Sequence, residues 1–214
     1  MVKYFLLFQF VCLTVSPAFA EAYWALQLGT GSAYSFDSPL TIKQDGEQTL
    51  DFTAEWETKA WSTQAIYYDL RLGKWENGRA WEIETLHHKL HLKNNPPEVQ
   101  SFVISHGYNL CTVNYAVLKE GIIYRIGAGV VVTHPETEVR GKKDFDDGGL
   151  RGFYLSGVTA QVAVEKRFEF PDSKWFFSLE GKLTASYAEV PIADGDATVP
   201  NVAVHGIFGV GYNF

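Results

Sequence analysis

Apolar and polar residues alternate in many short stretches of this chain, and beyond residues 1–20 no window approaches 18 uninterrupted apolar residues. In the segment 62–73, for instance, Ile66, Tyr68 and Leu70 face one way, and Asp69 faces the other. The lack of a long apolar run excludes a transmembrane helix. A strand of a transmembrane barrel needs only about ten residues with every second one apolar. The pattern therefore predicts an all-β protein that crosses a membrane as an antiparallel β-barrel.

The N-terminus has the three parts of a secretory signal peptide. Lys3 precedes an apolar run over residues 5–15, and Ala18-Phe19-Ala20 forms an A-x-A cleavage site. We expect residues 1–20 to be removed and residues 21–214 to form one barrel domain. Cys111 is then the sole cysteine, so no internal disulfide can form. The net charge of −7, with no basic stripe, argues against a nucleic-acid partner.

Turn signals divide the domain into eight predicted strands: residues 23–36, 62–73, 80–92, 108–117, 122–134, 152–168, 174–190 and 201–214. Residues 48–58 also alternate. They either belong to the first external loop, which leaves an eight-stranded antiparallel transmembrane β-barrel, or span the membrane and make nine strands. With the C-terminus in the periplasm, the short connections lie there and the long ones outside, as such barrels require. The short connections are residues 74–79, 119–121 and 171–173, and the long loops are residues 93–105, 135–151 and 191–200.

One face of these strands collects charged residues, which would fill the barrel interior: Asp69, Arg71, Glu82, Glu84, Arg125, Glu165, Arg167, Glu180 and Lys182. Paired charges fill a barrel this narrow, which argues against a transport pore. His88 and Ser186 point inward on the same pattern. A hydrolase could use such a pair, although nothing in the sequence indicates that the two side chains meet.

The lipid-facing side of three neighbouring strands ends in polar residues. On the strand at residues 80–92 this side begins with Trp81 and Ile83, which suit hydrocarbon, and its upper part would meet lipid headgroups. The polar residues predicted at this outer rim are His87, Lys89, His91, Asn109, His134 and Glu136. A β-bulge between residues 84 and 88 would swap the two faces. Rim histidines and lysines could also bind lipopolysaccharide phosphates without any catalysis.

The final strand places Phe208, Val210, Tyr212 and the terminal Phe214 on one face. An alternating strand with a terminal phenylalanine resembles the C-terminal signature of bacterial outer-membrane barrels. That resemblance implies a location in the outer membrane of a Gram-negative cell. It also implies recognition of the strand by the barrel-assembly machinery.

Several short motifs resemble those of the outer-membrane lipid A oxidases. They are Phe52-Thr-Ala-Glu-Trp56, Tyr67-Tyr68 with Arg71, His87-x-Lys89, Gly107-Tyr-Asn109 with Asn114, Gly127-Ala-Gly-Val130 and His134-Pro-Glu136. The resemblance covers most of the mature chain, and His106 departs from it because an acidic residue is expected there. It implies oxidation of the proximal glucosamine 1-phosphate unit of lipid A to aminogluconate by dioxygen. It also implies that the functional positions are His87, Lys89, Asn109, His134 and Glu136.

The residue types suit this chemistry. Lys89 could hold the anomeric phosphate, and His87, His134 and Glu136 could bind a divalent transition metal that activates oxygen. Without a metal, a histidine could act as general base. A non-catalytic structural or adhesive barrel, whose loops bind an outside partner, remains an alternative. Another is a lipid A deacylase or acyltransferase in which His88 or His106 activates a serine. We expect a monomer.

Overall fold

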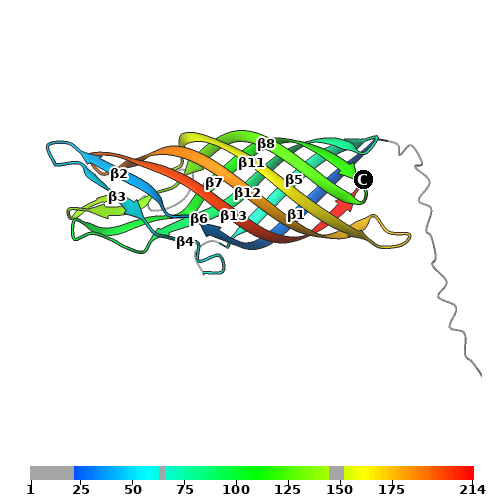
Figure 1. Cartoon of the computed structure of the whole chain (residues 1–214), viewed down its shortest axis with the longest axis horizontal. Coiled ribbons are helices and arrows are strands. Elements are labelled where there is room, and N and C mark those ends of the chain that lie inside the picture. Colours follow the sequence, from blue (N-terminus) through cyan, green and yellow to red (C-terminus); the bar gives the residue numbers. More distant parts are fainter. Residues whose placement is uncertain (1–21, 63–65, 145–151) are drawn as a thin grey trace, which may run out of the picture.

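The computed structural model describes residues 22–62, 66–144 and 152–214, and most of them lie in antiparallel strands. The predicted signal peptide, residues 1–20, lies outside the described residues. Eight long strands pair in a ring, in which β13 pairs with β1 and β6 pairs with β7, and Figure 1 shows them winding around one long axis. They are β1 (Tyr23–Ser35), β5 (Tyr68–Glu76), β6 (Arg79–Leu92), β7 (Val99–Lys119), β8 (Ile122–Thr133), β11 (Tyr154–Glu169), β12 (Trp175–Ile192) and β13 (Gly195–Asn213). The described residues include no helix that could cross a membrane.

The register around the ring fixes the tilt of the strands. Trp24 on β1 pairs with Lys74, and following successive partners through all eight strands leads back to β1 at Tyr34. The offset is therefore ten residues. With about 3.3 Å per residue and about 4.8 Å between strands, it corresponds to a tilt of about 40°. This tilt is typical of narrow transmembrane barrels, whose interior is filled by side chains.

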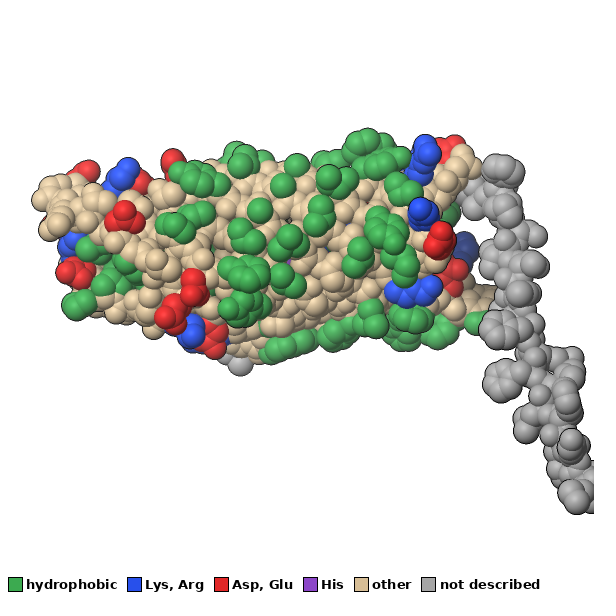
Figure 2. Space-filling view, in the orientation of Figure 1, with side chains coloured by type: hydrophobic (Ala, Val, Ile, Leu, Met, Phe, Trp, Pro, Cys, Tyr) green, Lys and Arg blue, Asp and Glu red, His purple; other side chains and the backbone are tan. Residues whose placement is uncertain are grey.

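The outer wall of the ring is apolar. Leu26 and Leu28 on β1, like Phe177 and Leu179 on β12, are large side chains exposed on this wall. Figure 2 shows hydrophobic side chains spread along the barrel, with charged side chains gathered towards its two ends. A wall of this kind is stable only in hydrocarbon. The protein thus has the fold of a membrane-spanning antiparallel β-barrel, as the sequence predicted.

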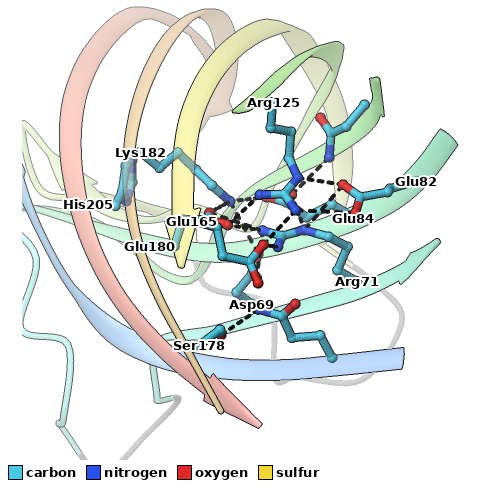
Figure 3. Close-up of polar contacts among 12 residues, drawn as sticks. Asp69, Arg71, Glu82, Glu84, Arg125, Glu165, Ser178, Glu180, Lys182 and His205 are labelled. Atoms are coloured by element: carbon cyan, nitrogen blue, oxygen red, sulfur yellow. Dashed lines mark hydrogen bonds and ion pairs between the residues drawn. The ribbon is translucent and has the colours of Figure 1, made fainter. Parts of the chain in front are cut away.

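The interior holds the predicted network of charges (Figure 3). Arg71 lies at its centre, with Nε 2.9 Å from Glu84 and Nη2 2.9 Å from Glu180. Arg125 donates from Nη1 to Glu180 over 2.7 Å, and Lys182 contacts the carboxylates of Asp69, Glu84 and Glu180. All nine charged residues predicted to face inward do so, and all but the half-buried Arg167 are buried. Each of these buried charges has partners of opposite charge, and together the side chains fill the barrel interior at the level of the network.

A layer of neutral polar side chains lies next to this network. Both ring nitrogens of His205 are hydrogen-bonded: Nδ1 lies 2.8 Å from Tyr67 Oη, and Nε2 lies 2.9 Å from Thr184 Oγ1. His88 Nε2 lies 3.1 Å from Ser35 Oγ. The serine that His88 meets is therefore not Ser186, which donates to Thr159 instead.

The strands continue beyond the membrane-spanning wall into an external extension, whose apolar core continues into the upper part of the barrel. Its additional strands are β2 (Ser38–Gln44), β3 (Leu50–Ala54), β4 (Trp56–Glu57), β9 (Glu136–Val139) and β10 (Lys142–Asp144). β2 and β3 form a hairpin at the end of the molecule far from the C-terminus (Figure 1). Leu40 and Ile42 from this hairpin pack in one cluster with Leu90, Phe102 and Ile104. Residues 48–58 hence belong to the first external loop, as the eight-strand prediction requires.

All three predicted long loops contain strands in the structure, so these predictions are wrong in whole or in part. Residues 191–200 are not a loop, because β12 and β13 continue through them and turn at Ala193 and Asp194. Proline is tolerated at position 191 because β11 last pairs with β12 at Ala188, so that Pro191 lies on a strand edge. In the loop predicted at 93–105, β7 already begins at Val99. In the loop predicted at 135–151, β9 and β10 form a hairpin, and residues 145–151 lie outside the described residues.

The strand β5 is short, and beside the upper part of β1 its place in the wall is taken by the segment that precedes β5. β1 pairs with β5 only from Tyr23 to Gly29. Above that level Thr30 Oγ1 donates a hydrogen bond to the carbonyl of Tyr67, over 2.8 Å. The described part of the segment between β4 and β5 projects beside β4 in Figure 1. This segment reaches the lipid-facing side of the barrel, where the predicted functional residues lie.

Candidate functional site on the outer wall

On β6, the residues predicted to face outward do so along the whole strand as far as the predicted site. β6 and β7 pair in regular register from Arg79 to His88, so there is no bulge between residues 84 and 88. The irregularity comes one step later, where His88 pairs with Tyr108 but Leu90 pairs with Ile104. The two extra residues are on β7, so His87 and Lys89 keep the outward parity of Trp81 and Ile83. With a rise of about 2.5 Å per residue along the barrel axis, His87 lies roughly 15 Å above Trp81, towards the outer leaflet.

Gly107 makes the irregularity in β7 possible. Its φ of +129° lies in a region that side chains rarely adopt, and a Cβ there would overlap the side-chain amide of Asn109. The Gly107 carbonyl accepts a hydrogen bond from the His134 backbone N–H over 3.0 Å. The glycine thereby brings Asn109 and His134 to the same part of the wall.

His87 is held by Asn109 and Tyr68. Its Nδ1 lies 2.7 Å from Asn109 Oδ1, while Asn109 Nδ2 donates to the Val132 carbonyl over 3.1 Å. Because the amide oxygen can only accept, Nδ1 must carry the proton of this hydrogen bond. The Tyr68 ring stacks on the imidazole, with centroids 5.0 Å apart and planes 3° apart. A neutral His87 held in this way has its basic lone pair on Nε2, as a general base requires.

His106, His134 and Glu136 form a second group beside the first. Glu136 Oε1 lies 2.5 Å from His106 Nδ1, and the His106 and His134 rings are 5.1 Å apart. Phe153 packs edge-on against His134 at 4.7 Å. A carboxylate that contacts one ring nitrogen of a histidine fixes the orientation of the ring.

Lys89 ties the segment between β4 and β5 to the site. Its Nζ donates to Ser62 Oγ over 2.6 Å and to the Lys59 carbonyl over 3.3 Å. The segment covers Lys89, which is fully buried although it faces outward from the barrel. The lysine is therefore a fixed positive charge on the wall and not a mobile surface side chain.

The five residues predicted for the site thus gather on one patch of the outer wall, supplied by β6, β7, the end of β8 and the start of β9. Asn109 links the two groups, because it contacts His87 and binds the backbone of Val132, two residues before His134. The sequence reasoning missed the roles of His106, Tyr68 and Ser62. The Tyr67-Tyr68 motif and the departure at His106 were the available signals, whereas nothing in the sequence indicated Ser62.

The metal-binding role predicted for His87, His134 and Glu136 lacks a matching arrangement. Among the described residues no group of three or more His, Cys, Asp or Glu side chains could hold a metal ion. Glu136 instead contacts His106, and Nδ1 of His87 is bound to Asn109. As arranged in the described part of the chain, these residues do not fit a metal centre.

No protein-family model matches the chain, and no curated protein sequence matches it. Among solved structures, the outer membrane protein AlkL, determined in lipid bilayers, is similar with a TM-score of 0.47 and 12% identity over 100% of this chain and 97% of AlkL. Neisserial surface protein A gives 0.41 and 8%, over 91% and 100% of the two chains. The attachment invasion locus protein Ail of Yersinia pestis gives 0.40 and 10%, over 90% and 97%. At TM-scores below 0.5 these likenesses add no argument, and the fold assignment rests on the strand pairing and the apolar wall.

Proposed function

We propose that this protein is an outer-membrane enzyme that oxidises the proximal glucosamine unit of lipid A. The observation that carries the proposal is the meeting of His87, Lys89, Asn109, His134 and Glu136 on the lipid-facing wall, towards the outer leaflet. A lipid moving laterally in that leaflet reaches such a site without leaving the membrane. The resemblance to the lipid A oxidases motivates the choice of reaction.

The residues of the site suit a phosphorylated sugar. Lys89, although covered by the segment before β5, supplies a positive charge that attracts a phosphate group to this patch, and the histidines supply hydrogen bonds. His87 accepts the proton of the anomeric hydroxyl at Nε2, because Asn109 holds its other nitrogen as a donor. His106, oriented by Glu136, donates or returns a proton on the opposite side of the site. Asn109 and Glu136 act here as positioning residues.

The redox balance of the reaction requires an electron acceptor. The anomeric carbon must first carry a free hydroxyl, so hydrolysis of the 1-phosphate, which leaves as inorganic phosphate, precedes this step. Oxidation of that hydroxyl to the lactone removes two electrons and two protons from the sugar, and dioxygen takes up the electrons and protons as hydrogen peroxide. Water then opens the lactone to the aminogluconate. The product therefore carries one oxygen atom more than the hemiacetal from which it forms.

Mass spectrometry of lipid A tests the proposal. Lipid A from cells that express the protein aerobically should gain the mass of one oxygen, and this gain should vanish without dioxygen. It should also vanish in His87→Ala and His134→Ala variants. His205→Ala serves as a matched histidine control, because His205 lies in the barrel interior, bonded to Tyr67 and Thr184. Heat-dependent gel mobility shows that each variant is folded.

The outcome separates this proposal from a structural or adhesive role. If lipid A keeps its mass when the folded barrel is present in an outer membrane with the dephosphorylated substrate, the oxidase is refuted. Attachment to a surface that depends on the external extension, and not on His87 or His134, would then support an adhesive barrel.

A second candidate is deacylation of lipid A, and the contact between Lys89 Nζ and Ser62 Oγ favours it. In Ser-Lys hydrolases a neutral lysine takes the hydroxyl proton and makes the serine a nucleophile. This candidate therefore requires Lys89 in its uncharged form, whereas the oxidase uses its charge. The acyl group would pass from the ester oxygen to Ser62, and water would release it as a fatty acid. Release of fatty acid from lipid A by the wild type, and not by Ser62→Ala, would establish this activity instead.

A further inference from the structure

An apolar groove runs along the lipid-facing wall beside the candidate site. It has a volume of about 490 Å³ and is lined from β12, β13, β1 and β5 and from the segment that precedes β5. Leu28 and Phe208 form its floor on the barrel, and Trp61 and Ile66 rise beside them. The groove opens towards the bilayer because all four of these side chains are exposed on the outer wall.

The position of Trp61 in this groove is fixed by the chain on both sides of it. Its neighbour Ser62 accepts the hydrogen bond from Lys89, and the carbonyl of Ala60 accepts a hydrogen bond from the Tyr67 backbone N–H over 2.8 Å. The indole stacks on Phe208 with ring centroids 6.3 Å apart, yet remains 58% exposed. A large exposed aromatic side chain held away from the core in this way forms one preorganised wall of a binding groove.

Tyr68 connects the groove to the candidate site. Its ring lines the groove and also stacks on His87. Lys89 similarly binds Ser62, which follows Trp61, and the carbonyl of Lys59, two residues before it. A molecule with an apolar tail and an anionic head could therefore place its tail in the groove and its head at His87 and Lys89.

A second apolar hollow of about 470 Å³ lies on the other side of Leu26, which lines both. Thr85 and Cys111 belong to it, and they lie directly below His87 and Asn109 on the same outward faces. Two hollows that share a wall below one polar site fit a lipid with several acyl chains better than a lipid with a single chain.

We propose that the groove at Trp61 binds one acyl chain of a multiply acylated lipid whose phosphorylated headgroup lies at His87 and Lys89. The occupant is a chain of lipid A, and this identification rests on the proposed function. The groove makes the enzyme select its substrate by its chains as well as by its sugar. The bilayer is continuous with the groove, so the chain enters sideways from the outer leaflet.

Leu28→Trp tests this proposal because it fills the groove without touching the polar residues. Val158→Trp is the matched control: Val158 is 62% exposed on the wall at β11, Leu28 is 59% exposed, and Val158 lines no part of the groove. The mature barrel, purified in detergent, is titrated with hexa-acylated lipid A, and the bound fraction is measured by native mass spectrometry. We expect Leu28→Trp to weaken binding about tenfold, the effect of losing roughly two methylene contacts. Trp61→Ala should weaken binding similarly, and Val158→Trp should leave it unchanged.

Titration with the bisphosphorylated disaccharide lacking acyl chains isolates the headgroup contribution, which Leu28→Trp should not alter. The groove proposal is overturned if Leu28→Trp and Trp61→Ala bind lipid A like the wild type, or if Val158→Trp weakens binding as much as Leu28→Trp. Because binding is measured without turnover, this result is independent of whether lipid A is oxidised. A barrel that binds lipid A through the groove but never oxidises it would refute the proposed reaction alone.

Discussion

Replacing Arg71 by methionine should destabilise the barrel more than any change on its outer wall. The Arg71 guanidinium is within 3.3 Å of Asp69, Glu84, Glu165 and Glu180. Methionine has a similar length but no charge. Removing one partner from a buried ionic network typically costs about 3–5 kcal/mol, because the remaining charges stay buried without compensation. Here the interior already has five carboxylates and four cations, so the imbalance grows.

Urea unfolding of the barrel in phospholipid vesicles, followed by tryptophan fluorescence, measures this loss. Lys74→Met is the control, since Lys74 is exposed near the opposite end of β5 from the site and should change the free energy of unfolding by less than about 1 kcal/mol. The double variant Arg71→Met/Asp69→Asn removes one charge of each sign and should recover part of the loss. A loss below about 1 kcal/mol for Arg71→Met, or no recovery in the double variant, would refute the reasoning.

Three further changes test other parts of the structure. Gly107→Ala should push the amide of Asn109 away from His87 and abolish lipid A modification in a barrel that still folds, as seen by mass spectrometry; unchanged modification would contradict the role of this glycine. Asn109→Leu removes the hydrogen bond that sets the His87 tautomer and should lower the modification rate by about tenfold or more, whereas Asn109→Gln should retain part of it; equal rates for all three proteins would argue against a positioning role. Leu40→Ala should raise hydrogen exchange in the β2–β3 hairpin more than in the membrane-spanning strands, because Leu40 lies on the hairpin and shares its core with the upper part of the barrel only. Equal acceleration along the whole chain would be inconsistent with that.

Residue parity predicted most of the barrel. The period-two alternation located the eight strands and assigned Asp69, Arg71, Glu180 and Lys182 to the interior, because in a one-layer wall every second residue must face lipid. The same parity placed His87 and Asn109 on neighbouring outward positions, where they form a hydrogen bond. The alternation of apolar and polar residues is informative here because one side of the wall faces lipid and the other faces a polar interior.

The external extension and the cover over Lys89 could not be predicted in the same way. Above the membrane both faces of a strand can be polar or buried, so parity no longer reports the environment, and the prolines at 191 and 200 suggested a loop where β12 and β13 continue. The contact of Lys89 with Ser62 joins a strand to an irregular segment 27 residues away in sequence, and no periodicity specifies such a contact. His106 was noted only as a departure from a motif, and its pairing with Glu136 depends on the two extra residues that β7 inserts beside it.

The charge network inside the barrel also constrains how the chain can enter a membrane. The hairpin of β5 and β6 contributes Arg71 with an excess of carboxylates, while Arg125 arrives on β8 and Lys182 on β12. The four interior charges of the β11–β12 hairpin balance one another, as the Arg167–Glu165 and Lys182–Glu180 pairs show. The β5–β6 hairpin has no such balance, and carrying its unpaired carboxylates into hydrocarbon before β8 and β12 arrive would be strongly unfavourable. We expect the strands to gather around a hydrated interior first. Water would leave that interior only as the last strand joins the ring and the opposite charges meet.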